Sequence, residues 1–140
     1  MDKELLFKEA LALQRERVTS PRLGLFRILV RKSPLSTATL IAEADKLSID
    51  QATCYRNLTL FRKIGLISDI VVGGQRMVEL TDSFGSHHHH FSCGQCGKVI
   101  DFDSETIEAA ISGAAGELGV AVSSHQLEII GVCASCRALA

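Results

Sequence analysis

Three kinds of segment are missing from this 140-residue sequence, and each absence narrows the class of protein. No run of about 18 apolar residues occurs, so we expect no transmembrane helix. The first residues, 1–4, lack the basic and apolar regions of a signal peptide, so we expect a cytoplasmic protein. No internal repeat is evident, and the only low-complexity segment is a short run of histidines.

Catalytic motifs are also missing. The sequence contains neither His-Glu-x-x-His, the pattern of zinc proteases, nor the His-x-Glu and Pro-Cys-x-x-Cys combination of zinc deaminases. No serine-type motif occurs either. We therefore expect that the protein is not an enzyme, with a zinc-dependent enzyme as the disfavoured alternative.

Basic side chains become scarce after residue 78. Residues 1–78 carry 13 Lys and Arg against 8 Asp and Glu, whereas residues 79–140 carry 2 against 8. The length fits one large or two small domains, and a hydrophobic fraction of 46% is enough to build their cores. A basic half joined to an acidic half predicts two tasks, nucleic-acid binding and metal-cation binding.

Cysteine is concentrated in two Cys-x-x-Cys pairs, Cys93 with Cys96 and Cys133 with Cys136. Two such pairs supply the four thiolates of a tetrahedral zinc site, and in a cytosolic protein metal binding is more common than structural disulfides. A redox role needs a pair at a helix N-terminus after a strand, and we expect neither pair to have that setting. The remaining cysteine, Cys54, lies in a helical pattern and is expected in the core.

Four consecutive histidines, His87 to His90, precede the first cysteine pair. This is more metal-binding capacity than one structural zinc requires, so we expect metal sensing as well. Side chains alternate along a strand, so the histidines would feed two separate sites on its two faces. The residues available to complete these sites are Glu79, Asp101, Glu108 and His125. The alternative interpretation is a solvated polar strand.

Four helices are predicted within residues 1–65. The expected helix caps are Thr19, Ser36 and Asp50, and Gly65 follows the last turn of the fourth helix. The predicted helices cover 3–16, 19–30, a segment from 36, and 50–65. Leu6, Ala10 and Leu13 are expected to face the core from the first helix, and Ala52, Leu58 and Phe61 from the fourth.

Apolar runs at 66–72 and 75–80 flank Gly73-Gly74, which predicts a β-hairpin. Helices followed by a hairpin make a winged helix-turn-helix. We therefore predict an α+β fold whose N-terminal winged helix-turn-helix domain covers residues 1–80.

Residues 81–86 are interpreted as a linker, and residues 87–140 as a second, α/β domain. Its predicted elements are strands at 87–92 and 98–102, a helix at 104–118 and a strand at 126–132. The residues that fit one apolar stripe of this helix are Ile107, Ala110, Ile111, Ala114 and Leu118.

The fourth helix carries Thr53, Tyr55 and Arg56 beside its apolar stripe. Arginine can read guanine edges or phosphates, and tyrosine can contact a thymine methyl group. On helical periodicity alone a solvated face explains these residues equally well. The hairpin and the basic half favour a DNA-reading helix.

These segments together resemble the ferric uptake regulator family over nearly the whole chain. The matching segments are Thr19-Ser-Pro-Arg22, Ala52-Thr-Cys-Tyr-Arg-Asn-Leu58, Gly65-Leu-Ile67, the histidine run, Cys93-Gly-Gln-Cys-Gly-Lys-Val99 and the last cysteine pair. The resemblance implies a homodimeric, metal-dependent transcriptional repressor of metal-uptake genes that binds double-stranded DNA at a pseudo-palindromic operator. It further implies that the C-terminal α/β domain, with its four-cysteine zinc site, dimerises.

The resemblance also implies roles for individual residues. Tyr55 and Arg56 match base-contacting positions, and Arg17 matches a basic residue that enters the minor groove. The structural zinc ligands are implied to be Cys93, Cys96, Cys133 and Cys136. One regulatory metal site is implied at His87, His89, Glu108 and His125. A second, which would link the two domains, is implied at Glu79, His88, His90 and Asp101.

This sequence departs from the family pattern at the second regulatory site and at His89. The loop at 31–35 lacks the histidine that the family usually supplies there, so Glu79 is the only expected ligand from the DNA-binding domain. His89 stands where iron-type members often have aspartate, which makes the first site richer in nitrogen and favours zinc over manganese. The second site, with two carboxylates and two imidazoles, favours iron or manganese instead. Iron-responsive and peroxide-sensing repressors remain alternatives, as does a zinc-ribbon adaptor protein.

Overall fold

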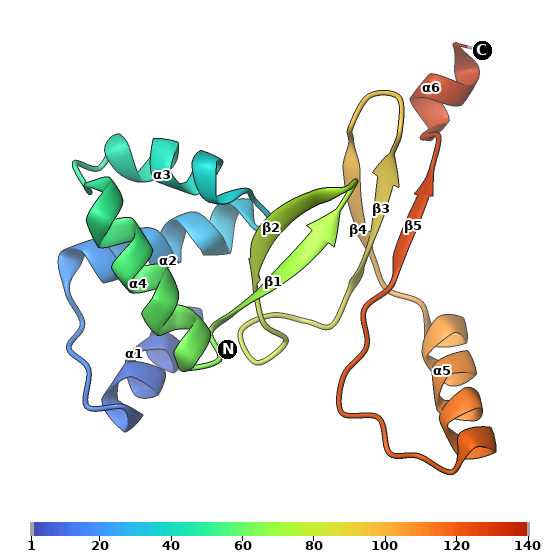
Figure 1. The fold of residues 1–140 in the computed structure, drawn as a ribbon, viewed down its shortest axis with the longest axis horizontal. Coiled ribbons are helices and arrows are strands. Elements are labelled where there is room, and N and C mark those ends of the chain that lie inside the picture. Colours follow the sequence, from blue (N-terminus) through green and yellow to red (C-terminus); the bar gives the residue numbers. More distant parts are fainter. Residues whose placement is uncertain (1, 140) are drawn as a thin grey trace. The chain divides into compact units, whose positions relative to one another are not determined.

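The computed structural model describes residues 2–139, which divide into two compact units with the boundary between Ser86 and His87 (Figure 1). The first unit contains four helices followed by a two-stranded hairpin. Its elements are α1 (Lys3–Leu13), α2 (Ser20–Lys32), α3 (Thr37–Asp45), α4 (Gln51–Lys63), β1 (Ile67–Val72) and β2 (Gln75–Leu80). This order is that of a winged helix-turn-helix, as predicted.

The helices of the first unit begin at side-chain caps. The side chain of Thr19 accepts a hydrogen bond from the backbone N–H of Arg22, and those of Ser36 and Asp50 accept equivalent bonds in α3 and α4. Each cap satisfies one of the backbone donors that a helix N-terminus leaves without a partner. At the other end of α4, Gly65 adopts φ 71°, a conformation that glycine takes without strain. All three predicted caps are confirmed.

Three aromatic rings join the helices in one core. Phe7 of α1 stacks on Phe26 of α2 with ring centroids 4.3 Å apart, and meets Phe61 of α4 edge-on at 5.7 Å. Phe84, within the segment 81–86, packs against Phe26 at 6.5 Å and is buried. These contacts fix α4 against α1 and α2 by apolar burial.

Two predicted core positions are wrong. Leu13 is 82% exposed at the end of α1, and the core is filled instead by Phe7 and Leu11, one turn apart. Ala52 is exposed in the first turn of α4, where Cys54 is buried as predicted. In α1 the buried stripe is rotated by one residue from the predicted one. In α4 the predicted Leu58 and Phe61 are buried, and only the first position differs.

The hairpin forms as predicted, with Ile67 opposite Leu80 and Val72 opposite Gln75. Its turn residues Gly73 and Gly74 adopt φ 58° and 77°, as a two-residue type I′ turn requires. Leu35, after α2, exchanges two backbone hydrogen bonds with Val78 of 2.9 and 3.1 Å. The hairpin is thereby tied to the loop that follows α2.

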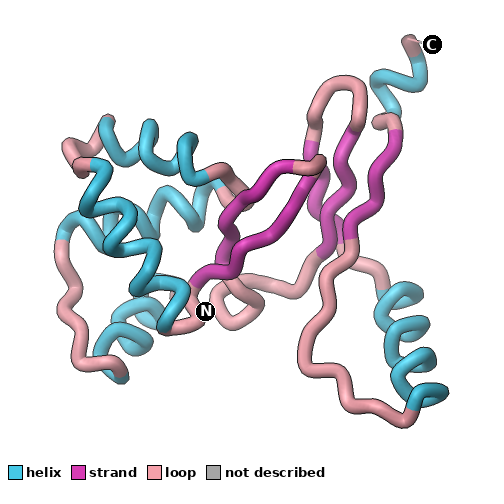
Figure 2. The backbone as a smooth tube through the Cα atoms, in the orientation of Figure 1, coloured by secondary structure: helices cyan, strands magenta, loops and turns pink. Residues whose placement is uncertain are grey.

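The second unit is a three-stranded sheet with two helices, which confirms the predicted α/β arrangement (Figure 2). Its elements are β3 (His89–Cys93), β4 (Val99–Phe102), α5 (Glu105–Leu118), β5 (Glu128–Gly131) and α6 (Ala134–Ala138). The strand order is β4-β3-β5, with β3 antiparallel to β4 and parallel to β5. The predicted strand 87–92 in fact begins at His89, and α6 was not predicted.

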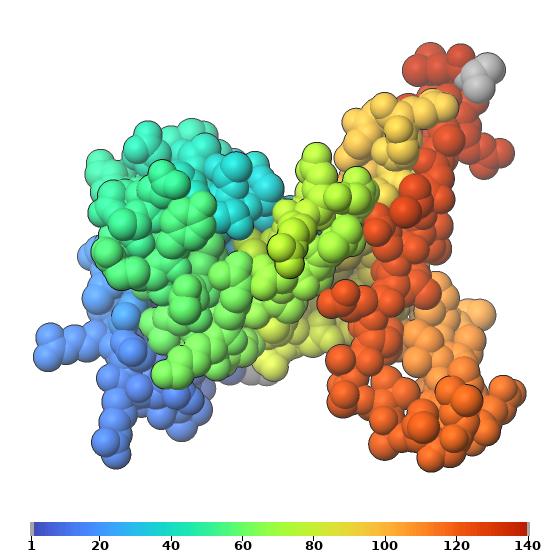
Figure 3. Space-filling view, viewed as in Figure 1, coloured from blue at the N-terminus to red at the C-terminus, as the bar shows by residue number. Residues whose placement is uncertain are grey.

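The apolar stripe of α5 is not covered within this unit. No residue of the described helix α5 is buried, and Leu118 is 76% exposed. The sheet and the loops add further exposed apolar side chains: Ile100, Val120, Val122, Ile129, Ile130, Val132 and Leu139. Figure 3 shows one face of the second unit, coloured from yellow to red. A set of this size on so small a unit is typical of a surface that another molecule covers.

Candidate metal centres and nucleic-acid interface

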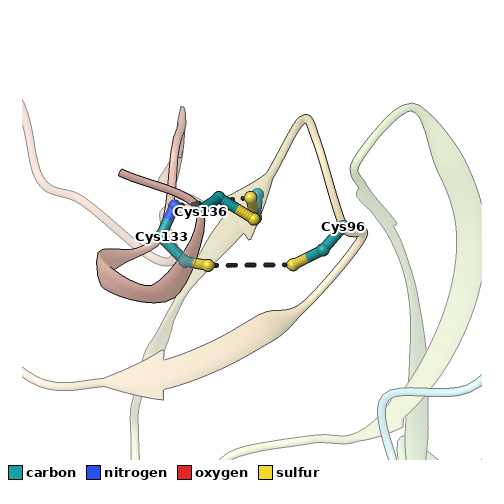
Figure 4. Close-up of side chains that lie close together, drawn as sticks. Cys96, Cys133 and Cys136 are labelled. Atoms are coloured by element: carbon teal, nitrogen blue, oxygen red, sulfur yellow. Dashed lines mark hydrogen bonds between the residues drawn. The ribbon is translucent and has the colours of Figure 1, made fainter. Parts of the chain in front are cut away.

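All four paired cysteines meet in one cluster. Cys93 ends β3, Cys96 lies in the β3–β4 turn, and Cys133 and Cys136 belong to the start of α6 (Figure 4). Their four sulfur atoms lie within 4.8 Å of one another, and the Sγ atoms of Cys96 and Cys133 are 3.7 Å apart. A tetrahedral zinc ion with bonds of about 2.3 Å requires sulfurs about 3.8 Å apart. The cluster therefore fits zinc in both donor type and spacing.

The thiols of this cluster differ in pKa. The backbone N–H of Cys96, and then that of Cys133 at 3.3 Å, lower the pKa of the Cys93 thiol to about 6. Hydrogen bonds with Cys133 and the other thiols raise the pKa of Cys136 to about 12. The backbone N–H of Cys136 lowers the pKa of Cys133 as well. Because Cys136 holds its proton, a divalent cation is what would allow all four sulfurs to ionise.

The setting of the second cysteine pair differs from our expectation. Cys133 follows β5 and is the N-cap of α6, so this pair does lie at a helix N-terminus after a strand. The five residues of α6 are too few for sequence periodicity to reveal them. All four sulfurs nevertheless converge, which is the arrangement of a four-thiolate metal site rather than of an isolated redox pair.

Three histidines and one carboxylate form a second cluster. The Nε2 atom of His89 lies 2.6 Å from the Glu108 carboxylate, that of His87 3.1 Å and that of His125 3.2 Å. The Nε2 atoms of His87 and His125 are 3.0 Å apart. The side chains come from β3, from the segment before it, from α5 and from the segment before β5. The structure thus brings together all four residues predicted for the first regulatory site.

This second cluster also has the donor set of a metal site. Hydrogen bonds from His89, and then from His125 and His87, lower the pKa of Glu108, so the carboxylate is ionised. The His89 side chain is buried, whereas those of His87 and Glu108 are 36% and 38% exposed, so the cluster is accessible to an ion from solvent. Ligand atoms bound to zinc at about 2.0–2.1 Å lie about 3.3 Å apart in a tetrahedron. The observed separations of 2.6–3.2 Å are slightly shorter, so small outward movements would admit the ion.

Three of the four residues predicted for the second regulatory site, His88, His90 and Asp101, belong to the second unit. The Nδ1 atom of His90 lies 3.0 Å from Oδ1 of Asp101, its partner across β3 and β4. The rings of His88 and His90 are 4.9 Å apart. Glu79 lies on β2 of the first unit, opposite Ser68. Its membership of this set stays a prediction.

Sequence reasoning missed a polar contact beside this set. The hydroxyl of Ser92, buried in β3, donates to Oε1 of Glu128 at 2.7 Å. Glu128 of β5 is also the register partner of His90, so carboxylates flank this histidine on both neighbouring strands. The parallel pairing of β3 with β5 produces this arrangement, and a local sequence pattern does not reveal it.

The predicted DNA-contacting residues lie on one helix and one loop of the first unit. Tyr55 is 50% exposed on α4, and Arg56 is exposed beside it. The guanidinium of Arg56 donates to the Thr53 hydroxyl at 3.0 Å, which itself donates to Asp50 at 2.9 Å. Arg17 is exposed in the loop between α1 and α2. These side chains are accessible to a ligand, as DNA contact requires.

The fold and its clusters define a class of protein. In this class a winged-helix unit is followed by an α/β unit that carries two sets of residues able to bind metal ions. Within this class the chain belongs to the ferric uptake regulator family, whose sequence model matches residues 14–130. Among residues 2–139, no helix is both long enough and apolar enough to cross a membrane.

Several known proteins are similar to this chain along most of its length. The peroxide operon regulator of Bacillus subtilis (strain 168) is 35% identical over 135 residues, which cover 92% of each chain. The ferric uptake regulator of Vibrio cholerae is 30% identical, covers 90% of this chain and 98% of its own, and has a TM-score of 0.72. The ferric uptake regulator of Francisella tularensis, solved with iron, is 28% identical, covers 86% and 94%, and has a TM-score of 0.69. The predicted family and fold class are confirmed.

Proposed function

We propose that this protein is a metal-responsive transcriptional repressor that binds DNA as a homodimer in the cytoplasm. The observation that carries the proposal is the convergence of His87, His89, Glu108 and His125 around one point in a chain that also contains a winged helix. A site of three imidazoles and one carboxylate binds divalent metals and releases them when the free concentration falls. The winged helix would bind the DNA whose transcription the metal regulates.

The four cysteines are assigned to a structural zinc. Zinc held there would join the β3–β4 turn to the start of α6, two segments 37 residues apart in sequence. Because the thiolates repel one another without a cation, metal binding at this position contributes directly to the folding free energy. This zinc would be permanent and would not report on the metal supply.

The histidine and glutamate cluster is assigned to the regulatory metal. Its ligands come from β3 and the segment before it, from α5 and from the segment before β5, so a metal there would hold these segments together. We propose that this shifts the population of the protein toward a conformation in which two winged helices have the spacing of the operator. DNA then binds more tightly, because the protein loses less conformational entropy on binding. His88, His90, Asp101 and Glu79 are proposed as a second regulatory set.

DNA contact is assigned to the domain of residues 1–80, with 81–86 as the linker to a dimerisation domain of residues 87–140. Thr53, Tyr55 and Arg56 would enter the major groove, and Arg17 the minor groove. The exposed apolar side chains of the second unit support a dimer, because a second copy of the chain would cover them. A dimer reads two half-sites, so we expect a pseudo-palindromic operator.

Zinc is the metal that we favour. The regulatory cluster offers three nitrogens and one carboxylate, a set that suits zinc better than manganese. The second candidate function is a peroxide-responsive repressor, which the similarity to the Bacillus subtilis peroxide operon regulator favours. An iron-responsive repressor is the third.

The proposal is tested by selecting DNA from a random duplex library with the full-length protein. We expect a pseudo-palindromic sequence to be recovered when zinc, iron(II) or manganese(II) is supplied. We expect binding of that duplex to weaken at least tenfold when the regulatory metal is removed by a mild chelator that leaves the four-cysteine zinc in place. Recovery of no sequence, or equal binding with and without metal, would contradict the proposed function. A zinc-ribbon adaptor or a zinc enzyme would give that result.

A further inference from the structure

Arg22, in the first turn of α2, is the centre of a hydrogen-bond network that the proposed function does not use. Its Nε atom donates to Oδ1 of Asn57 on α4 at 3.0 Å. Its Nη1 atom donates to the backbone carbonyl of Arg17 at 2.6 Å. Its Nη2 atom pairs with the carboxylate of Glu16 at 2.9 Å. One side chain therefore joins the recognition helix to the loop between α1 and α2.

The Asn57 end of this network is fixed and buried. Asn57 is 7% exposed, and its Nδ2 atom donates to the backbone carbonyl of Thr53 at 2.9 Å. Guanidinium is a donor only, so the amide oxygen has to face Arg22 and the amide nitrogen has to face Thr53. The network thereby contacts α4 directly beside Tyr55 and Arg56.

The other end holds the loop that carries Arg17. The bond to the Arg17 carbonyl orients that backbone while the Arg17 side chain remains exposed. Arg22 itself is only 19% exposed, and three of its five N–H groups are engaged with protein acceptors. It is therefore poorly placed to bind a phosphate, and well placed to set the position of the residues that do.

We propose that Arg22 is a positioning residue for DNA recognition, which holds the Arg17 loop at a fixed place relative to α4. This inference rests on the proposed DNA-binding function and deepens it. A planar guanidinium reaches acceptors in three directions from one rigid group, whereas the ammonium of lysine is a single point charge. The positive charge of Arg22 alone would therefore not be sufficient.

The test compares Arg22→Gln and Arg22→Lys with Arg27→Gln in the full-length, metal-loaded protein. Arg27 lies on the same helix, but its ion pair with Glu4 at 2.6 Å is on the surface and does not involve α4 or the Arg17 loop. The DNA probe is the duplex that the wild-type protein selects. If the wild type selects no duplex, the proposed function fails; if it selects one, the variants test Arg22 alone.

We expect both Arg22 variants to bind the selected duplex roughly tenfold more weakly, because the loop must then be ordered on binding. Arg27→Gln should bind within about twofold of the wild type. The slope of log affinity against log salt should be unchanged in Arg22→Gln, since no phosphate contact is lost. Combining Arg22→Gln with Asn57→Ala should weaken binding little further than either change alone, since both break the same bond.

Three results would overturn the proposal. Arg22→Lys binding like the wild type would show that charge alone is sufficient. A salt slope reduced by about one would make Arg22 a phosphate contact. Loss of the helical circular dichroism signal in both Arg22 variants would make the role one of folding.

Discussion

At the scale of single residues, the cysteines differ in the pKa of their thiols. Burial raises the pKa of the Cys54 thiol in the core, backbone N–H groups lower that of Cys93 to about 6, and neighbouring thiols raise that of Cys136 to about 12. Cys93 is therefore largely ionised at neutral pH. Binding of zinc must then displace the proton of Cys136, so zinc affinity falls as pH falls.

The first prediction concerns this cluster. Cys93→Ser or Cys136→Ser should lose one equivalent of zinc and weaken the dimer, because the metal site contributes to the folding of the second unit. Zinc content by elemental analysis and mass by sedimentation measure both effects. Cys54→Ala is the matched control and should retain the zinc. A Cys93 or Cys136 variant that kept all its zinc and remained dimeric would refute the assignment.

The second prediction concerns Arg56. Arg56→Ala should cost about 1–3 kcal/mol of specific DNA binding if the side chain reads a base. Metal content should be unchanged, since Arg56 belongs to none of the three ligand sets. Titration of the selected duplex measures the loss, and Arg27→Ala controls for charge. Retained operator affinity in Arg56→Ala would remove α4 from the recognition role.

At the scale of elements, the histidines at 87–90 contribute side chains to two different clusters. His87 and His89 meet Glu108, whereas His90 meets Asp101 on the opposite face of β3. The alternation of a strand separates the two sets, although β3 itself begins only at His89. Substitutions at neighbouring positions therefore affect different sites.

The third prediction uses this alternation. His89→Ala or His125→Ala should impair metal-triggered DNA binding at least as much as His88→Ala, because the cluster around Glu108 is complete in this chain. Binding of the selected duplex during a titration with buffered metal measures the response. If only His88 and Glu79 variants lost it, the second set would be the sensor.

The fourth prediction concerns the hairpin turn. Gly74→Ala should destabilise the first unit by about 1–2 kcal/mol, because φ 77° is unfavourable for alanine although the space for its methyl group is open. Gly85→Ala has equally open space without the positive φ and is the matched control. Urea denaturation compares the two variants. Equal stability of both would contradict the turn assignment.

Local signals in the sequence predicted the winged helix well. The caps Thr19, Ser36 and Asp50 and the Gly73-Gly74 turn are short-range features, and each formed where expected. The five-residue helix α6 escaped prediction because it is too short to show a period. Periodicity identified the apolar stripe of α5 but does not reveal whether residues of the same chain cover it.

The candidate site was predicted in part from spacing and in part from the family resemblance. Paired cysteines and adjacent histidines are visible in the sequence, and the four-sulfur cluster follows from them. Glu108 and His125 lie 17 residues apart on different segments, so only the fold brings them to the same point. The network of Arg22 and Asn57 depends on the packing of α2 against α4 and was not visible beforehand.

At the scale of the whole molecule, the proposed DNA contacts lie in one unit, and all the metal-type ligands except Glu79 lie in the other. The basic and acidic halves of the sequence correspond closely to these units. Coupling between them requires that metal binding change the population of DNA-competent dimers by a free energy of about 1–3 kcal/mol, the usual range for such coupling.

The most direct test of a zinc-responsive repressor is made in cells that carry a reporter behind the selected operator. We predict that a zinc chelator raises reporter expression, that an iron chelator and peroxide do not, and that His89→Ala is derepressed from the start. Derepression by the iron chelator alone would make the protein an iron-responsive repressor. Derepression by peroxide alone would make it a peroxide sensor, and either result would contradict the account.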